Sequence, residues 1–189
     1  MMTEEFDTGD GRRAWLTRDE FALLVDALDE PMRQVAARLG AESGLRSDEI
    51  VRVVPDHLYR DPEVGPMLQV PEGKTGHRET IISEGLADLV RALGHGAPDE
   101  PVVPRSTRAV RSWMQDAREQ LREHDDRWRW VTPHDWRRTW AGWLANDDVD
   151  ERVALRWGGW SDLETFLDHY RGEATARAQA RERSKIEWL

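Results

Sequence analysis

A histidine, two arginines and three tryptophans fall within the short segment VTPHDWRRTWAGWL of an otherwise acidic chain. Thr132 followed by Pro133 favours a helix that begins at this point, because both residue types are common at helix starts. His134 and Arg137 are then three positions apart, so both side chains should lie on one face of the first turn. The unpaired backbone N–H groups and the helix dipole also favour an anion there. The segment therefore predicts an anion site, with phosphate as the candidate ligand.

The tryptophans of this segment form a separate stripe. Trp136, Trp140 and Trp143 follow the i, i+4, i+7 spacing of a single helical face. We therefore expect them to pack in the core of the protein rather than to stack on nucleic-acid bases.

Four more residues along the chain are suited to act on a phosphate. Arg46 lies at a predicted helix-to-helix turn, Lys74 at the tip of a predicted hairpin, Trp160 after two glycines, and Tyr170 at the end of a predicted helix. Each has an ordinary explanation when it is considered alone. Arg46 could form a surface ion pair, Lys74 could be exposed to solvent, His134 could cap its helix, and Trp160 and Tyr170 could pack in the core. The order of the whole set is more informative than any member.

In chain order, this set resembles the catalytic residues of the tyrosine recombinases, the phage integrase family. The matching segments are GLRSDEI, with Glu49 three residues after its arginine, then EGKTGHRETIIS, HDWRRTW and GGWSDLETFLDHYRG. They cover nearly the whole chain, in the order that the family has. Two features depart from the family pattern: Trp160 stands where most members have histidine, and its separation from Tyr170, ten positions, is one longer than expected.

The resemblance implies a reaction on DNA without metal, ATP or other cofactor. Tyr170 would attack a phosphodiester and form a 3′-phosphotyrosyl bond, although a tyrosine hydroxyl, with a pKa of about 10, needs activation for this. Arg46 and Arg137 would stabilise charge on the non-bridging oxygens. Lys74 would protonate the leaving 5′ oxygen.

The other members of the set have supporting roles. Trp160 can only donate a hydrogen bond, through its indole N–H. His134 would either accept the tyrosine proton or donate to the phosphate, and both roles stay open. Glu49 would not contact the DNA itself but would hold Arg46 in position.

The elements that position these residues are predicted to be mainly helical. Thr17 and Glu20 form a capping box, Pro31 favours a second helix that ends at Ser43 and Gly44, and Ser47 is a candidate cap for a short third helix. Residues 57–83 predict a small antiparallel sheet. Further helices are expected near residues 84–93, 106–123, 133–146, 150–157, 161–170 and 173–187. The fold class is therefore α+β, similar to a tyrosine recombinase catalytic domain.

Three regions follow from this pattern. Residues 1–14 are interpreted as a flexible polar leader, residues 15–172 as the catalytic domain, and residues 173–189 as a helical tail. The tail could dock on a neighbouring protomer or fold back on its own domain. Whether a DNA-clamping domain precedes this chain in the native gene stays open.

Charge and composition limit the environment. The net charge is −10, yet residues 127–189 carry 11 basic and 11 acidic residues, so the acid excess lies in residues 1–126. Only two lysines accompany 25 arginines. An acidic, lysine-poor chain predicts a halophilic archaeal or viral source, although a GC-rich genome would also explain the shortage of lysine.

Without cysteine there is no disulfide or thiolate site, and no apolar run approaches the ~20 residues of a membrane span. We expect a cytoplasmic protein.

Three functions are compatible with these residues. We favour a site-specific DNA recombinase that acts on double-stranded DNA. It is expected to assemble as a tetramer on synapsed sites and to be weakly associating or monomeric without DNA. The alternatives are a type IB topoisomerase, which relaxes DNA without strand exchange, and a catalytically silent DNA-binding paralogue.

Overall fold

The computed structural model describes residues 1–6, 11–73, 76–160, 166 and 183–186. Its helices are α1 (Arg18–Ala27), α2 (Pro31–Ser43), α3 (Ser47–Ile50), α4 (Glu84–Gly94), α5 (Thr107–Leu121), α6 (Pro133–Asn146) and α7 (Glu151–Gly158). Its strands are β1 (Met2–Glu5), β2 (Arg12–Trp15), β3 (Leu58–Asp61), β4 (Gly65–Gly73) and β5 (Gly76–Ile81). Short 3-10 turns occur at Pro55–His57 and Asp126–Trp130. The predicted α+β class is confirmed.

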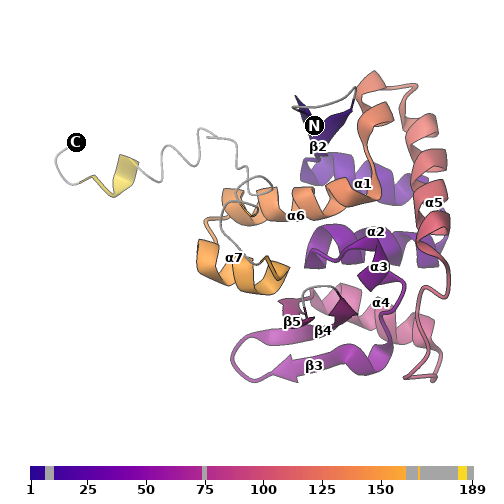
Figure 1. Ribbon diagram of the computed structural model, residues 1–189, viewed down its shortest axis with the longest axis vertical. Coiled ribbons are helices and arrows are strands. Elements are labelled where there is room, and N and C mark those ends of the chain that lie inside the picture. The colour runs from indigo at the N-terminus through magenta and orange to yellow at the C-terminus, as the bar shows by residue number, and fades with distance from the viewer. Residues whose placement is uncertain (7–10, 74–75, 161–165, 167–182, 187–189) are drawn as a thin grey trace.

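Helices α2 and α6 pack against each other in the middle of the molecule (Figure 1). Trp136 lies on the α6 side of this contact and is 1% exposed. It packs on Gly40 of α2, where an added Cβ atom would lie 2.9 Å from the tryptophan Cβ. Trp140 and Trp143 are also buried, which confirms the prediction that the three tryptophans belong to the core.

Several helix boundaries lie where the sequence predicts them. Thr17 and Glu20 form the expected capping box of α1, and α2 begins at Pro31. Gly44 ends α2 in the left-handed conformation, with a φ of 69°. A side chain there would also collide with Trp140, whose ring lies 2.4 Å from the position of an added Cβ atom. Helix α3 begins at Ser47, so the cap falls one residue earlier than predicted.

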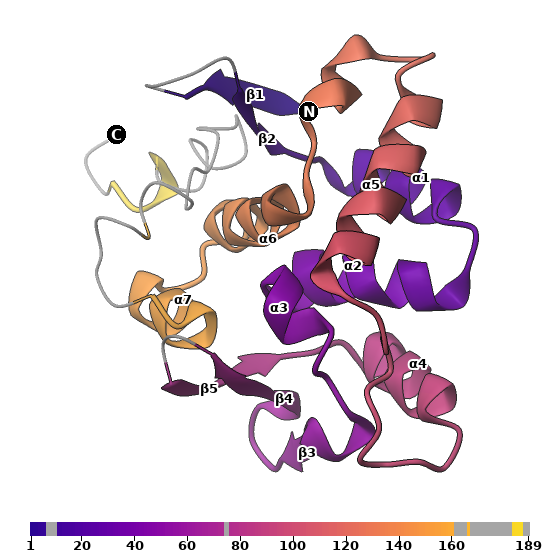
Figure 2. The same ribbon diagram turned by 45° about the vertical axis from the view of Figure 1, so that its right-hand side comes forward.

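The predicted small sheet is formed by β3, β4 and β5, which pair in that order and run antiparallel. It lies at the opposite end of the molecule from the β1–β2 hairpin (Figures 1 and 2). Helix α7 packs against β5 and helix α3 against β4. The sheet therefore contacts both the turn before α3 and the segment that leads to Trp160.

The first residues of the chain differ from the predicted flexible leader. β1 pairs with β2, with Met2 opposite Trp15. The backbone N–H of Ala14 donates to the Asp135 carboxylate at 3.2 Å, and the N–H of Leu16 donates to Thr139 Oγ1 at 3.0 Å. Both acceptors belong to α6, more than 120 residues further along the chain. A local sequence pattern does not reveal such distant partners.

The predicted helices at 161–170 and 173–187, and the tail at 173–189, lie largely outside the described residues. Within the described part, Phe166 is fully buried, and residues 183–186 include one short helical turn. None of the helices described here combines the length and apolar character needed to span a membrane.

Candidate active site

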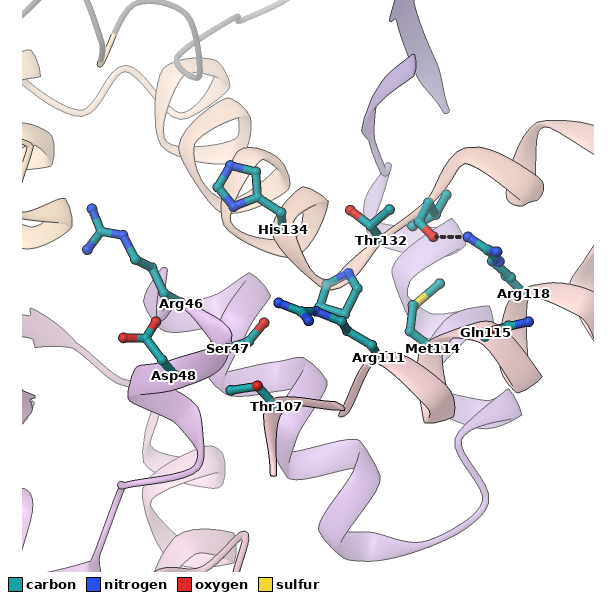
Figure 3. A pocket seen from close by; sticks show the side chains of 12 residues that line it. Arg46, Ser47, Asp48, Thr107, Arg111, Met114, Gln115, Arg118, Thr132 and His134 are labelled. Carbon is teal, nitrogen blue, oxygen red and sulfur yellow. Dashed lines mark hydrogen bonds between the residues drawn. The ribbon is translucent and has the colours of Figure 1, made fainter. Parts of the chain in front are cut away.

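A cavity of about 630 Å³ opens between the start of α3, one face of α5 and the start of α6 (Figure 3). Its walls include four side chains with basic groups and a single carboxylate, Asp48. The basic residues are Arg46, Arg111, Arg118 and His134. Thr132, Pro133 and His134 at the start of α6 complete this side of the cavity, at the positive end of the helix dipole. This combination suits a phosphate or another anion.

The cations of the cavity come from different elements. Figure 3 shows Arg46 before α3, Arg111 on α5 and His134 on α6. Arg118 also lies on α5, and its guanidinium donates to the carbonyl oxygen of Val131 at 3.4 Å. Tertiary structure therefore brings together residues that are up to 88 positions apart in the chain.

Glu49 holds Arg46 by both its backbone and its side chain. The Arg46 N–H donates to Glu49 Oε2 at 2.7 Å, and Arg46 Nη1 donates to Oε1 at 3.1 Å. Glu49 is 2% exposed. Burial raises the pKa of its carboxyl, but the charge and hydrogen bond of Arg78 and the Arg46 N–H outweigh burial and lower it overall.

Arg137 lies in the interior rather than on the cavity wall. It is 1% exposed, and its terminal nitrogens donate to the carbonyl oxygens of Gly44 and, at 2.6 Å, of Gly158. Burial and the nearby charges of Arg46 and Arg78 hold its pKa well below the usual value. The expectation that His134 and Arg137 share one anion-binding face therefore differs from the structure: His134 is exposed at the cavity, whereas Arg137 points inward.

Trp160 follows two glycines and packs against Arg137. Its ring stacks on Trp140 with centroids 5.8 Å apart and meets Phe166 edge-on at 4.9 Å. The Arg137 guanidinium carbon lies 4.1 Å from the Trp160 ring centroid, a cation–π geometry. Gly158 makes room for this ring, because an added Cβ atom would approach it to 1.8 Å.

Sequence reasoning missed Arg78, which lies on β5 beside these residues. Its side chain is 5% exposed and forms a 2.6 Å ion pair with Glu49. The available signal was strand alternation, because Arg78 and the buried Thr80 are two positions apart and so share one face of β5. An arginine at a core-facing strand position is unusual and indicates a specific partner.

Most of the sequence matches a known family model. The model described as the phage integrase family matches residues 14–177. The chain belongs to the phage integrase family. The resemblance inferred from its segments is thereby confirmed at the level of the family.

Solved structures of recombinases share the fold of this integrase-family chain. XerA recombinase superposes with a TM-score of 0.73 at 16% identity, over 92% of this chain and 66% of that one. The Tn1549 transposon integrase in complex with transposon right-end DNA gives 0.67 at 15% identity, over 95% and 67%. The lambda integrase dimer bound to a core site gives 0.65 at 17% identity, over 87% and 49%. The chain thus has the tyrosine recombinase catalytic-domain fold.

One sequence relative is named as an enzyme of another kind, not as a recombinase. A tRNA (guanine-N(7)-)-methyltransferase of Roseobacter denitrificans is 28% identical over 110 residues, which are 58% of this chain and 41% of that protein. This chain therefore spans less than half of that protein and about two thirds or less of the recombinases above. So partial a likeness does not carry the methyltransferase activity to this chain. The described sheets are antiparallel, whereas open sheets that bind nucleotide cofactors are mostly parallel.

Two of the family-derived candidates, Lys74 and Tyr170, lie outside the described residues. β4 ends at Gly73 and β5 begins at Gly76, and these two glycines are paired. Of the other candidates, Arg46 and His134 line the cavity. Glu49, which bonds to Arg46, and Arg137 are buried, and Trp160 packs on Arg137. Within the described part of the chain, no three His, Asp or Glu side chains form a metal-binding group.

Proposed function

We propose that this chain is the catalytic part of a site-specific DNA recombinase that cleaves and rejoins DNA through a 3′-phosphotyrosyl intermediate. The cationic cavity formed by Arg46, Arg111, His134 and the start of α6 is the observation that carries this proposal. It lies within the residues matched by the phage integrase family. A DNA phosphate is the anion that such a family would bring to it.

In this proposal the cavity residues contact the scissile phosphate directly. Arg46 presents a planar, permanently charged group to the non-bridging oxygens, and Glu49 fixes its orientation. His134 contacts the phosphate or accepts the tyrosine proton. Arg137 adds its charge from the interior, where electrostatic interactions are screened less than in water. Trp160 packs on Arg137 and so supports its position.

Tyr170 is the nucleophile and Lys74 the general acid of this proposal, on the basis of their places in the matched family. Attack by the Tyr170 hydroxyl on phosphorus forms the phosphotyrosyl bond and releases a 5′ oxygen, which takes a proton from Lys74. The reverse attack by a DNA 5′ hydroxyl reseals the strand, so neither ATP nor a metal ion is required.

The setting of the reaction is also proposed. Double-stranded DNA is the partner, and protomers assemble as a tetramer on two synapsed sites, with residues 173–189 as the candidate contact between them. The protein is proposed to be cytoplasmic. The net charge of −10 and the small number of lysines, two, support a halophilic source and therefore work in concentrated salt.

A nicked suicide DNA substrate tests this function, because loss of a short fragment past the nick traps the covalent complex. The chain contains only two tyrosines, Tyr59 and Tyr170. Wild type and Tyr59→Phe are expected to give a covalent protein–DNA band on a denaturing gel, and Tyr170→Phe to give none. If folded wild-type protein gives no band across a library of candidate sites, the silent DNA-binding paralogue becomes the better account.

A further inference from the structure

Arg78 joins three separate segments of the site through one buried guanidinium. Its Nη1 donates to the carbonyl oxygen of Trp157 at 2.5 Å. Its Nη2 donates to Glu49 Oε2 at 2.6 Å and lies 3.4 Å from the carbonyl oxygen of Gly44. The sheet, the turn before α3 and the end of α7 therefore meet at this side chain.

The bond to Glu49 connects Arg78 with Arg46. Glu49 Oε2 accepts both from Arg78 and from the Arg46 backbone N–H, at 2.6 and 2.7 Å. The other carboxylate oxygen accepts from the Arg46 side chain. Arg78 thus fixes the carboxylate that fixes Arg46, and Arg46 lines the cavity.

The bond to Trp157 acts on the other side of the site. The last four carbonyl groups of a helix have no partner within the helix. At the end of α7, arginines satisfy two of them: Arg78 binds the carbonyl of Trp157 and Arg137 binds that of Gly158. These cations also suit the negative end of the helix dipole. The same pair of arginines shares the carbonyl of Gly44.

Gly159 makes this arrangement possible. It adopts a left-handed conformation with a φ of 63°, and an added Cβ atom would lie 2.4 Å from Arg78 Cδ. A side chain at this position would therefore strain the backbone and push Arg78 away from its three acceptors. Glycine at position 159 and arginine at position 78 fit each other.

We propose that Arg78 is a positioning residue for DNA strand cleavage: it holds Arg46 through Glu49 and holds the end of α7, which leads to Trp160, through the Trp157 carbonyl. This role rests on the recombinase function proposed above. Arg78 does not contact the phosphate itself, because its side chain is buried and its terminal nitrogens are occupied by protein acceptors.

Cleavage kinetics test the role directly. With saturating suicide DNA, Arg78→Met is expected to lower the rate of covalent adduct formation by about 10²-fold, since a displacement of about 1 Å costs this much. Its DNA dissociation constant should change far less, because Arg111 and His134 keep the cavity cationic. Arg78→Lys should recover only part of the rate, because a single ammonium group cannot reproduce the planar fork.

Loss of stability must be separated from loss of positioning. The double variant Glu49→Gln/Arg78→Met removes both buried charges, so it should be more stable than Arg78→Met alone. Its cleavage rate is nevertheless expected to stay low, because Arg46 has lost its carboxylate partner. If the rate recovers together with the stability, the slow cleavage of Arg78→Met came from lost stability alone, and that result would overturn the proposal.

A third measurement does not depend on recombinase activity. Hydrogen exchange of the Arg46 amide reports on its bond to Glu49 Oε2, and Arg78→Met should accelerate it at least about tenfold. Amides in the middle of α5 should be unchanged. If wild type forms no adduct but the Arg46 amide responds, the proposed function fails while the link from Arg78 to Arg46 stands. An unchanged Arg46 amide overturns the link itself.

Gly159→Ala provides an independent perturbation of the same side chain. It should reproduce the slow cleavage and the faster Arg46 exchange of Arg78→Met. Gly85→Ala is the matched control, because an added Cβ atom there would meet nothing within 4 Å. Full cleavage activity in folded Gly159→Ala would contradict the coupling between the two positions.

Discussion

The Glu49 carboxylate offers a test of the site at the scale of one residue. Its pKa is lowered overall: burial raises it, but Arg78 and the Arg46 N–H lower it more. In the folded state this carboxyl therefore stays ionised at pH values just below 4.5, which is its ordinary pKa. Its contribution to stability is fully present above pH 4.5 and is lost as the pH falls through the lower, folded-state pKa.

Glu49→Gln is expected to lower the free energy of unfolding at pH 7 by about 3–5 kcal/mol, because it leaves buried arginine charge without its partner. The difference from wild type should shrink as the pH falls below 4.5, because the carboxyl of the unfolded chain then takes up a proton, whereas the folded carboxyl stays ionised until the pH reaches its lower pKa. Urea unfolding between pH 7 and pH 3 measures both effects. The exposed Glu100 provides a control, and equal stability losses for Glu100→Gln and Glu49→Gln would contradict this account.

Residue types and their order predicted much of the candidate site, but not the directions of its side chains. Arg46 and His134 do line a common cavity, although 88 positions separate them. Arg137 points inward because the carbonyl groups of Gly44 and Gly158 accept its hydrogen bonds. Arg78 was missed for the same reason. Its acceptors are Gly44 in the turn before α3, Glu49 in α3 and Trp157 in α7, and only the folded chain brings those segments together.

At the scale of elements, contact between α2 and α6 depends on Gly40. An added Cβ atom at this position would lie 2.9 Å from both Cβ and Cε3 of Trp136. Gly40→Ala is therefore expected to destabilise the fold by about 1–3 kcal/mol through overpacking, despite the higher helix propensity of alanine. Thermal or urea unfolding checks this value. Gly85→Ala in α4 has open space around it and should be neutral or stabilising, so equal effects of the two substitutions would refute the packing argument.

Elements held by interactions between residues close in sequence were predicted correctly, whereas an element held by residues far apart in sequence was not. Helix α1 has a local capping box and α6 begins at a local Thr-Pro pair, and both begin where the sequence predicts. Residues 1–14 were predicted to be a flexible polar leader rather than part of a hairpin, because the side chains that hold this segment, Asp135 and Thr139, belong to α6. Local signals thus locate helix ends, whereas the hairpin depends on a distant helix.

The distribution of charge matters at the scale of the whole molecule. The chain carries 37 acidic and 27 basic residues, yet the cavity has one carboxylate among four basic side chains. Repulsion between DNA and an acidic surface is thereby weakest at the candidate site. At 1 M salt the Debye length is about 3 Å, so both the repulsion and the attraction are screened beyond that distance. Direct bonds to phosphate must therefore provide a larger share of the binding free energy in concentrated salt.

The salt dependence of DNA binding tests whether Arg111 makes such a bond. For duplex DNA, the logarithm of the binding constant falls against the logarithm of salt concentration with a slope of about −0.9 per neutralised phosphate. Removing one phosphate contact with Arg111→Gln should therefore reduce the steepness of this line by about 0.9. Fluorescence anisotropy in a Tyr170→Phe background measures binding without covalent capture. Arg91→Gln is the control, because Arg91 is exposed on α4, pairs with Asp88 and does not line the cavity. The same slope for Arg111→Gln and for the control would place the DNA backbone away from α5 and would move the proposed interface to another face of the protein.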